Sequence, residues 1–202
     1  MENMSKISDD LFLGDIQAGR DSSVLGTMSV IDLSNSLPET PAEVAAIKAS
    51  RGKPCLCLAE QRLVVMGIQD TDQAAADMVD QFAPICKFAD AAIATGRPVL
   101  FHCFEGKSRS AVALIHYMMV RKTGANCTLL EAYRRVKAAR PGIRLNNGFR
   151  QLLNRVELTL RPSAPSVQLK IRKKPKLSSA RQRAAPAAAA AKSSPAPAPA
   201  AR

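Results

Sequence analysis

The chain of 202 residues contains 47% hydrophobic residues and carries a formal net charge of +12. This apolar content is sufficient for a packed core, so we exclude a chain that is disordered throughout, and the length suits one domain with residues left over. No apolar run approaches the ~20 residues of a membrane-spanning helix and no cleavable leader is recognisable, so we expect a soluble intracellular protein without a transmembrane segment. The five cysteines are odd in number and follow no metal-ligand spacing, which predicts reduced thiols and no bound metal.

Short apolar runs predict the strands. They lie at residues 11–14, 29–34, 63–68 and 98–101. The last run is almost continuously apolar, which is typical of a strand buried in a mostly parallel sheet. Cys55 and Cys57 alternate in the manner of strand residues, and we interpret them as such and not as zinc ligands.

Helical patterns lie between and after these strands. The predicted helices cover residues 77–96, 110–124, 128–141 and 146–160. Pro84 is expected to kink the first helix or to mark where its regular part begins. The second is apolar nearly all round, which predicts a buried central helix, and its His116 has no partner motif and is expected to be structural. Thr128 and Glu131 form a capping box that opens the third helix.

The order of these elements predicts the fold class. Strands alternate with helices, which favours an α/β domain with a central, mostly parallel sheet of about five strands and helices on both faces. Residues 161–202 differ from this pattern, because they contain ten Lys or Arg and no acidic residue, whereas 19 basic and 17 acidic residues precede them. This segment is rich in Ala and Pro, and burial cannot offset its ordering entropy. We therefore predict a domain at residues 8–160 and a disordered basic tail at residues 161–202.

Residues 101–110, FHCFEGKSRS, place polar and reactive groups between an apolar strand and an apolar helix. Backbone amides in a tight loop before a helix N-terminus can surround a phosphate, and the helix dipole adds to the attraction. Cys103 would lose its proton easily beside these dipoles, and a thiolate is a nucleophile. Arg109 can hold two phosphate oxygens in its planar fork. The stretch therefore predicts a phosphate site that contains a covalent nucleophile.

These residues also resemble a known family. The pattern His102-Cys103-x-x-Gly106-x-Ser108-Arg109-Ser110 is similar to the active-site signature of the dual-specificity protein phosphatases, a branch of the cysteine-based protein tyrosine phosphatases. The stretches 9–21, 30–35 and 140–157 resemble the first strand, the second strand and the closing helix of that family, the last with its Asn-x-Gly-Phe turn. The resemblance covers about residues 8–160. It implies an enzyme that hydrolyses phosphotyrosine and phosphoserine or phosphothreonine without a metal or other cofactor.

The resemblance also implies a role for each residue of the signature. Cys103 would attack phosphorus and form a phosphocysteine, and Arg109 would stabilise the transition state together with the loop amides. Ser110 would donate a hydrogen bond to the cysteine sulfur and ease its departure. His102 would hold the loop in place and lower the pKa of the thiol. The remaining residues of the phosphate-binding loop are Phe104, Glu105, Gly106, Lys107 and Ser108.

The family takes its general acid from an aspartate in a loop before the cysteine, and two residues are candidates here. Asp70 follows the strand alternation through Met66 and Ile68, whereas counting back from the following helix favours Asp72. We prefer Asp70 because the end of a strand determines its position while the loop beyond it can absorb an insertion. Asp72 remains the alternative.

Two residues of the loop bear on the substrate class. Lys107 matches a lysine of the inositol-lipid phosphatases of the wider superfamily, but Phe104 stands where those enzymes carry a second lysine, and Glu105 would repel a polyanionic headgroup. A phosphoprotein, for example a kinase, is therefore the expected substrate. A phosphoinositide or other non-protein phosphatase, and a pseudophosphatase that binds phosphoresidues as an adaptor, remain alternatives.

The run KIRKKPK at residues 170–176 is the most basic part of the tail. It is compatible with an import signal, with contact to acidic partners, or with non-specific binding to nucleic-acid phosphates. Base stacking is excluded because residues 161–202 contain no aromatic residue. We expect a cytoplasmic protein with an additional nuclear pool.

Overall fold

A computed structural model describes residues 3–36, 40–50, 55–59, 61–121, 127–166 and 168–172. The first compact unit of the chain is Met1–Ile171. The predicted tail beyond Arg172 lies outside the described residues. Within the described ranges, no helix is both long and apolar enough to cross a membrane.

The centre of this unit is a mixed sheet that has six strands in the described part of the chain, in the order β1-β2-β6-β3-β5-β4. The strands are β1 (Met4–Lys6), β2 (Leu11–Gly14), β3 (Ser29–Asp32), β4 (Cys55–Ala59), β5 (Arg62–Met66) and β6 (Val99–His102). The four middle strands are parallel, and the edge strands β1 and β4 are antiparallel to their neighbours. The predicted mostly parallel sheet is therefore confirmed. Strand β1 was not predicted because its three residues carry no alternating pattern.

The helices are α1 (Ile16–Arg20), α2 (Ser22–Thr27), α3 (Pro41–Ser50), a 3₁₀ turn η1 (Asp72–Ala74), α4 (Ala75–Ala94), α5 (Arg109–Val120), α6 (Leu129–Ala139) and α7 (Asn147–Leu160). Helix α4 continues across Pro84. Helix α5 ends at Val120 and not at the expected Gly124, and residues 122–126 lie outside the described part. The capping box of Thr128 and Glu131 is present. Helices α1 and α2 are too short to show a clear period in the sequence.

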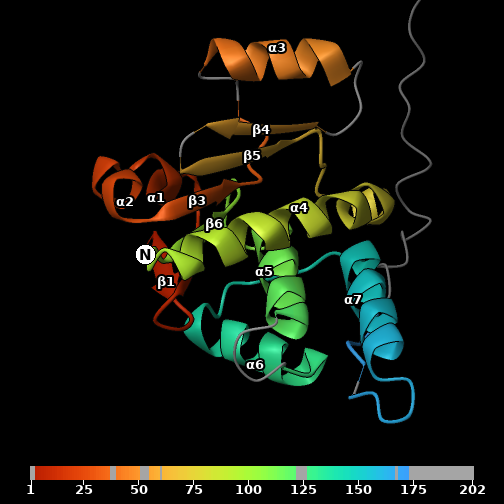
Figure 1. The fold of residues 1–202 in the computed structure, drawn as a ribbon. Helices are drawn as coiled ribbons and strands as arrows, with labels where there is room; N and C mark the ends of the chain where they lie inside the picture. The colour runs from red at the N-terminus through yellow and green to blue at the C-terminus, as the bar shows by residue number, and fades with distance from the viewer. Residues whose placement is uncertain are drawn as a thin grey trace, which may run out of the picture. The chain divides into compact units, whose positions relative to one another are not determined.

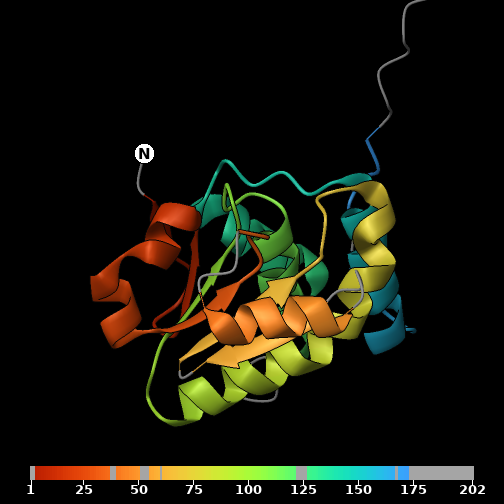
Figure 2. The same cartoon turned by 90° about the horizontal axis from the view of Figure 1, so that it is seen from above.

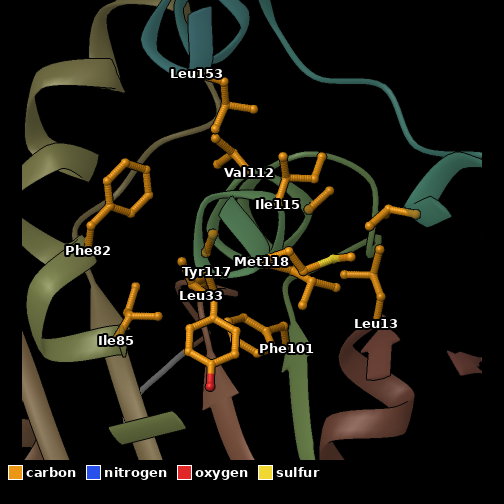
Figure 3. Packing of buried hydrophobic residues seen from close by; sticks show 14 of the residues in the cluster. Leu13, Leu33, Phe82, Ile85, Phe101, Val112, Ile115, Tyr117, Met118 and Leu153 are labelled. Carbon is orange, nitrogen blue, oxygen red and sulfur yellow. The ribbon is translucent and has the colours of Figure 1, made fainter. Parts of the chain in front are cut away.

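Helices cover both faces of the sheet, as predicted (Figures 1 and 2). Helices α4 and α5 pack on one face, and α6 and α7 pack against α5. On this side Ile31 and Phe101 of the sheet join the main core, which is shown around α5 in Figure 3. The alternate residues Val30 and Leu100 face the other side, where they pack with Ala18 of α1 and with α2. Ten consecutive residues of α5 are buried, which confirms the predicted central helix.

The segment after α7 returns to the domain. We call residues 161–166 and 168–171 the C-terminal strap. Asn154 of α7 exchanges two hydrogen bonds with the backbone of Leu169, at 2.8 and 3.0 Å, and the Leu169 side chain is buried. Arg150 donates to the carbonyl of Lys170 at 3.1 Å. The compact unit thus extends to Ile171, beyond the boundary expected near Leu160.

Candidate active site

The candidate site lies at the carboxyl edge of the four parallel strands. In such sheets the loops after neighbouring strands converge on one edge, where ligands bind. The loops after β3, β5 and β6 converge there and line a cavity of about 530 Å³. Its lining consists of Ser34, Asn35, Gln69, Asp70, Thr71, Cys103, Phe104, Glu105, Lys107, Ser108 and Arg109. The structure therefore brings together three segments that are far apart in the sequence.

Cys103 follows the end of β6, which extends one residue further than expected, to His102. Its side chain is only 3% exposed, and the hydroxyl of Ser110 donates a hydrogen bond to its sulfur at 3.2 Å. Burial alone would raise the pKa of this thiol. Hydrogen bonds from the Ser110 side chain and backbone, the charge of Arg109 and the backbone of Ser108 more than offset burial, so the pKa lies below its ordinary value. These contacts favour the thiolate.

The carbonyl groups of the phosphate-binding loop are bound from outside. The backbone N–H of Ile16 donates to the carbonyl of residue 104 at 3.3 Å, and that of Arg144 donates to the carbonyl of residue 107 at 2.8 Å. The guanidinium of Arg140 donates to the carbonyl of Gly106 at 2.9 Å. Because the C=O and N–H of one peptide plane point in opposite directions, the N–H that follows each of these carbonyls is directed away from its partner. The arrangement turns amide donors toward the inside of the loop.

Gly106 makes this compact loop sterically feasible. Its φ of +65° lies in the left-handed region, which favours glycine. A Cβ atom at this position would also collide with the backbone carbonyl of Gly14. A side chain at residue 106 would therefore force the loop away from β2.

Arg109 reaches over the loop from the first position of α5. Its Nη1 donates to the carbonyl of Ser34 at 3.0 Å. Its Nε is buried, and no atom of the described residues accepts a hydrogen bond from it. A buried donor without an acceptor is costly, and an oxygen of a bound phosphate would satisfy it.

A buried ion pair lies beside His102, the last residue of β6 before the loop. Asp32 lies opposite His102 in the β3–β6 ladder, and its carboxylate is 3.5 Å from Nε2 of the imidazole. Asp32 also binds Arg62 at 2.5 Å and accepts the backbone N–H of Ser34 at 2.7 Å. Burial lowers the pKa of His102 and outweighs the attraction of Asp32. His102 is therefore neutral at neutral pH and adds no positive charge beside the thiol.

Asp70 and Asp72 have different surroundings. Asp70 lines the cavity, and its Oδ1 accepts hydrogen bonds from the hydroxyl of Ser108 at 2.6 Å and from the side-chain amide of Asn146 at 2.8 Å. Asp72 begins η1, and its Oδ1 accepts the backbone N–H groups of Asn147 and Gly148 at 2.8 and 3.2 Å. Asp72 thus binds the N-terminus of α7, whereas Asp70 lines the same cavity as Cys103 and Arg109.

Several residues of the site were not singled out by the sequence. Asn35 has a left-handed φ of 56°. Its side-chain amide donates to the carbonyl of Ile68 at 2.6 Å, and its Oδ1 accepts the N–H of Gly67 at 2.9 Å. Asn35 therefore links the turn after β3 to the loop of Asp70. Asn35 and Asn146 both lie in stretches that resemble the family, which was the only available signal. Arg140 and Asp32 act through backbone contacts and a cross-strand pair, and such contacts leave no mark in a sequence pattern.

Comparison with known proteins decides the family. Residues 24–158 match the family model "Dual specificity phosphatase, catalytic domain". This chain belongs to that family. It is 32% identical over 155 residues to human dual specificity protein phosphatase 13B, an alignment that covers 75% of this chain and 72% of the relative.

Solved structures of the dual specificity phosphatases share the fold. A mouse putative dual specificity phosphatase, crystallised with zinc tungstate, has a TM-score of 0.61 and 25% identity over 80% of this chain and 91% of its own. Human DUSP28 has a TM-score of 0.57 and 24% identity over 80% of this chain and 97% of its own. The protein is therefore a phosphatase of the dual specificity family, and phosphoproteins are its substrate class.

Proposed function

We propose that this protein hydrolyses phosphotyrosine and phosphoserine or phosphothreonine in protein substrates through a phosphocysteine at Cys103, without a metal ion. One observation carries the proposal: Cys103, Arg109 and Asp70 line a single cavity of about 530 Å³. Hydrogen bonds from Ser110 and the charge of Arg109 lower the pKa of the Cys103 thiol, and the buried Nε of Arg109 has no acceptor among the described residues.

In the first step the Cys103 thiolate attacks phosphorus. An S–P bond forms while the bond from phosphorus to the substrate oxygen breaks, and that oxygen needs a proton. The Asn146 amide and the Ser108 hydroxyl both donate to Oδ1 of Asp70, so Oδ2 is the atom that would carry the transferred proton. Arg109 and the loop amides stabilise the equatorial oxygens in the transition state.

In the second step a water molecule attacks the phosphocysteine. Asp70, now a carboxylate, accepts the water proton as the P–O bond forms and the S–P bond breaks. The released thiolate is stabilised by the hydroxyl of Ser110, at 3.2 Å in the structure. Inorganic phosphate leaves and Asp70 is protonated again, which closes the cycle.

Hydrolysis of an aryl phosphate in the presence of a chelator tests this function. The wild-type protein should turn over, and Cys103→Ser should abolish hydrolysis while retaining phosphopeptide binding. Cys86→Ser is a matched control, because burial and the charge of Asp90 raise the pKa of the Cys86 thiol to about 12 and keep it protonated. A Cys103→Ser variant with a tenth of wild-type activity, or activity lost to the chelator, would refute the mechanism.

A phosphoprotein is favoured over an inositol lipid at this site. Lys107, the residue shared with lipid phosphatases, lies 3.2 Å from Glu105, so its charge is partly neutralised at the rim. We propose a phosphoprotein, for example a kinase, as substrate, and expect phosphopeptides to be hydrolysed in preference to phosphoinositides in vesicles. A higher kcat/KM on the vesicles would reverse this assignment.

We further propose that the basic segment at residues 170–176 acts as an import address, which gives a nuclear pool beside a cytoplasmic one. Ten basic residues and no acid in residues 161–202 support this. Neutralising Arg172, Lys173, Lys174 and Lys176 should shift the protein to the cytoplasm and leave aryl phosphate hydrolysis unchanged. An unaltered distribution would refute the address.

A further inference from the structure

A second hollow adjoins the catalytic cavity. It has a volume of about 470 Å³ and is bounded by the start of α1, by the last residue of α6 and the three residues after it (139–142), and by the phosphate-binding loop. Three residues of that loop, Phe104, Glu105 and Lys107, line both hollows. A substrate whose phosphate lies over Cys103 can therefore continue directly into the second hollow.

The charged groups in this wall already have partners. Arg140 donates to the backbone carbonyls of Gly106 and Glu105, at 2.9 and 3.4 Å, and lies 3.8 Å from the carboxylate of Asp15. Lys107 lies 3.2 Å from Glu105. Two cations are thus matched by two carboxylates, and Arg140 is held by the loop it supports. The hollow has no net positive charge with which to bind a second phosphate.

The remaining wall is largely apolar. Phe104 is 59% exposed, which is unusual for a phenylalanine, and it stands between the two hollows. Ile16, Ala139 and Pro141 also line this hollow. An exposed aromatic ring beside an apolar hollow gains free energy when a ligand removes it from water.

We propose that this hollow is a specificity subsite that takes an apolar side chain of the phosphoprotein substrate, close in sequence to the phosphoresidue. The subsite rests on the proposed function, since the phosphate in the catalytic cavity sets the position of the peptide. An extended peptide advances ~3.3 Å per residue, so a residue within about three positions of the phosphoresidue is close enough to enter. Substrates with leucine, isoleucine, methionine or phenylalanine there are favoured over acidic ones.

A peptide panel tests the subsite. Phosphotyrosine peptides carry leucine, alanine, aspartate or phosphothreonine at each position within three residues, and an aryl phosphate serves as the substrate that cannot reach the hollow. With the wild-type full chain, leucine at one of these positions should raise kcat/KM over aspartate by roughly tenfold or more. Equal rates for all peptides, or a preference for aspartate or phosphothreonine, would overturn the proposal.

Substitutions of residues that line the second hollow test the subsite directly. Ile16→Ala reduces the apolar surface that lines the second hollow, and Ala139→Phe partly fills the hollow. Neither residue lines the catalytic cavity with its side chain. Both should lower kcat/KM on the leucine peptide by roughly five- to twentyfold through KM, and leave hydrolysis of the aryl phosphate and the alanine peptide unchanged. Val79→Ala is the matched control, because Val79 is an exposed apolar residue of α4 outside the hollow. Loss of the leucine preference in Val79→Ala as well, or its retention in both wall variants, would contradict the subsite.

The experiments distinguish a wrong subsite proposal from a wrong proposed function. If the wild-type protein hydrolyses no substrate, the proposed function fails. Fluorescence anisotropy with the Cys103→Ser full chain then still compares the leucine and aspartate phosphopeptides. Tighter binding of the leucine peptide, weakened in Ile16→Ala, supports the subsite, and equal binding of both peptides overturns it.

Discussion

The side-chain amide of Asn146 donates a hydrogen bond to Asp70, which precedes it in the sequence by 76 residues, at 2.8 Å. The orientation of this amide is set by its own oxygen, which accepts the backbone N–H of Phe149 at 2.8 Å in the first turn of α7. The N-cap of α7 thus holds the aspartate that lines the cavity of Cys103. The adjacent residues 147 and 148 bind Asp72 instead.

The two aspartates should respond differently to the loss of their charge. We expect Asp70→Asn to reduce kcat by ~10²–10⁴ on a phosphothreonine peptide, whose leaving group needs a proton, and far less on a nitrophenyl phosphate. Asp72→Asn should retain turnover and lower the free energy of unfolding by about 1 kcal/mol, because it weakens the cap of α7. Steady-state kinetics and urea denaturation measure both effects. The reverse pattern would make Asp72 the general acid.

Loss of the Ser110 hydroxyl should change the pH profile of the enzyme. This hydroxyl lowers the pKa of the Cys103 thiol, so in Ser110→Ala the thiolate forms only at higher pH. We expect the acidic limb of kcat/KM to move to higher pH and the phosphocysteine to hydrolyse ~10–100-fold more slowly, as for a lost hydrogen bond to a charged group. Ser110→Thr should restore part of both. An unchanged acidic limb would show that Ser110 does not stabilise the thiolate.

Stability should decrease between pH 7.5 and pH 5.5 because of the two histidines. Burial lowers the pKa of His116 to about 4, and His116 stacks on Phe82 with a centroid distance of 3.6 Å. Burial also lowers the pKa of His102. The unfolded chain binds protons below a pH of about 6.5, whereas His116 stays neutral in the fold and His102 binds a proton less readily there, so unfolding is favoured as the pH falls.

His116→Phe isolates one of these contributions. The variant keeps an aromatic ring against Phe82 and removes a titrating group, so the loss of stability over this pH range should shrink by about 1 kcal/mol. Urea denaturation at pH 7.5, 6.5 and 5.5 measures the difference. Carboxylates with lowered pKa, such as Asp32, lose their contribution only at more acidic pH. An identical pH dependence in the variant and the wild type would mean that the pKa of His116 is the same in the folded and the unfolded chain.

The C-terminal strap should contribute to the stability of the domain. Glu157 is fully buried and accepts the backbone N–H groups of Leu129 and Ser166, at 3.1 and 3.0 Å, and the guanidinium of Arg161 at 2.9 Å. A chain that ends at residue 160 loses two of these donors and exposes the site of Leu169. We expect it to unfold about 2–4 kcal/mol more easily than a chain that ends at residue 172. Equal stability of the two chains in urea would place the boundary of the domain at Leu160.

The sequence alone was sufficient for the parts of the protein that depend on neighbouring residues. Cys103, Arg109 and Ser110 lie within eight positions, and an apolar strand before them and an apolar helix after them predict the loop geometry without further information. The capping box at Thr128 and the buried helix α5 were predicted for the same reason. Hydrogen bonds within one turn and the periodicity of one element can be read from a short stretch.

Only the tertiary structure determined three other features: the hydrogen-bond partners of Asp70 and Asp72, the contacts that hold the phosphate-binding loop, and the end of the domain. Strand alternation favoured Asp70 over Asp72 in the sequence, but their different partners follow from the position of α7, whose Asn146 binds Asp70 and whose Asn147 binds Asp72. Asp32 reaches His102 because β3 pairs with β6, a strand order that no local pattern contains. Arg140 holds the phosphate-binding loop from a position 34 residues beyond Gly106. Each of these contacts joins segments that approach one another only after the sheet has formed, so their energy depends on the whole fold and not on any stretch of the sequence.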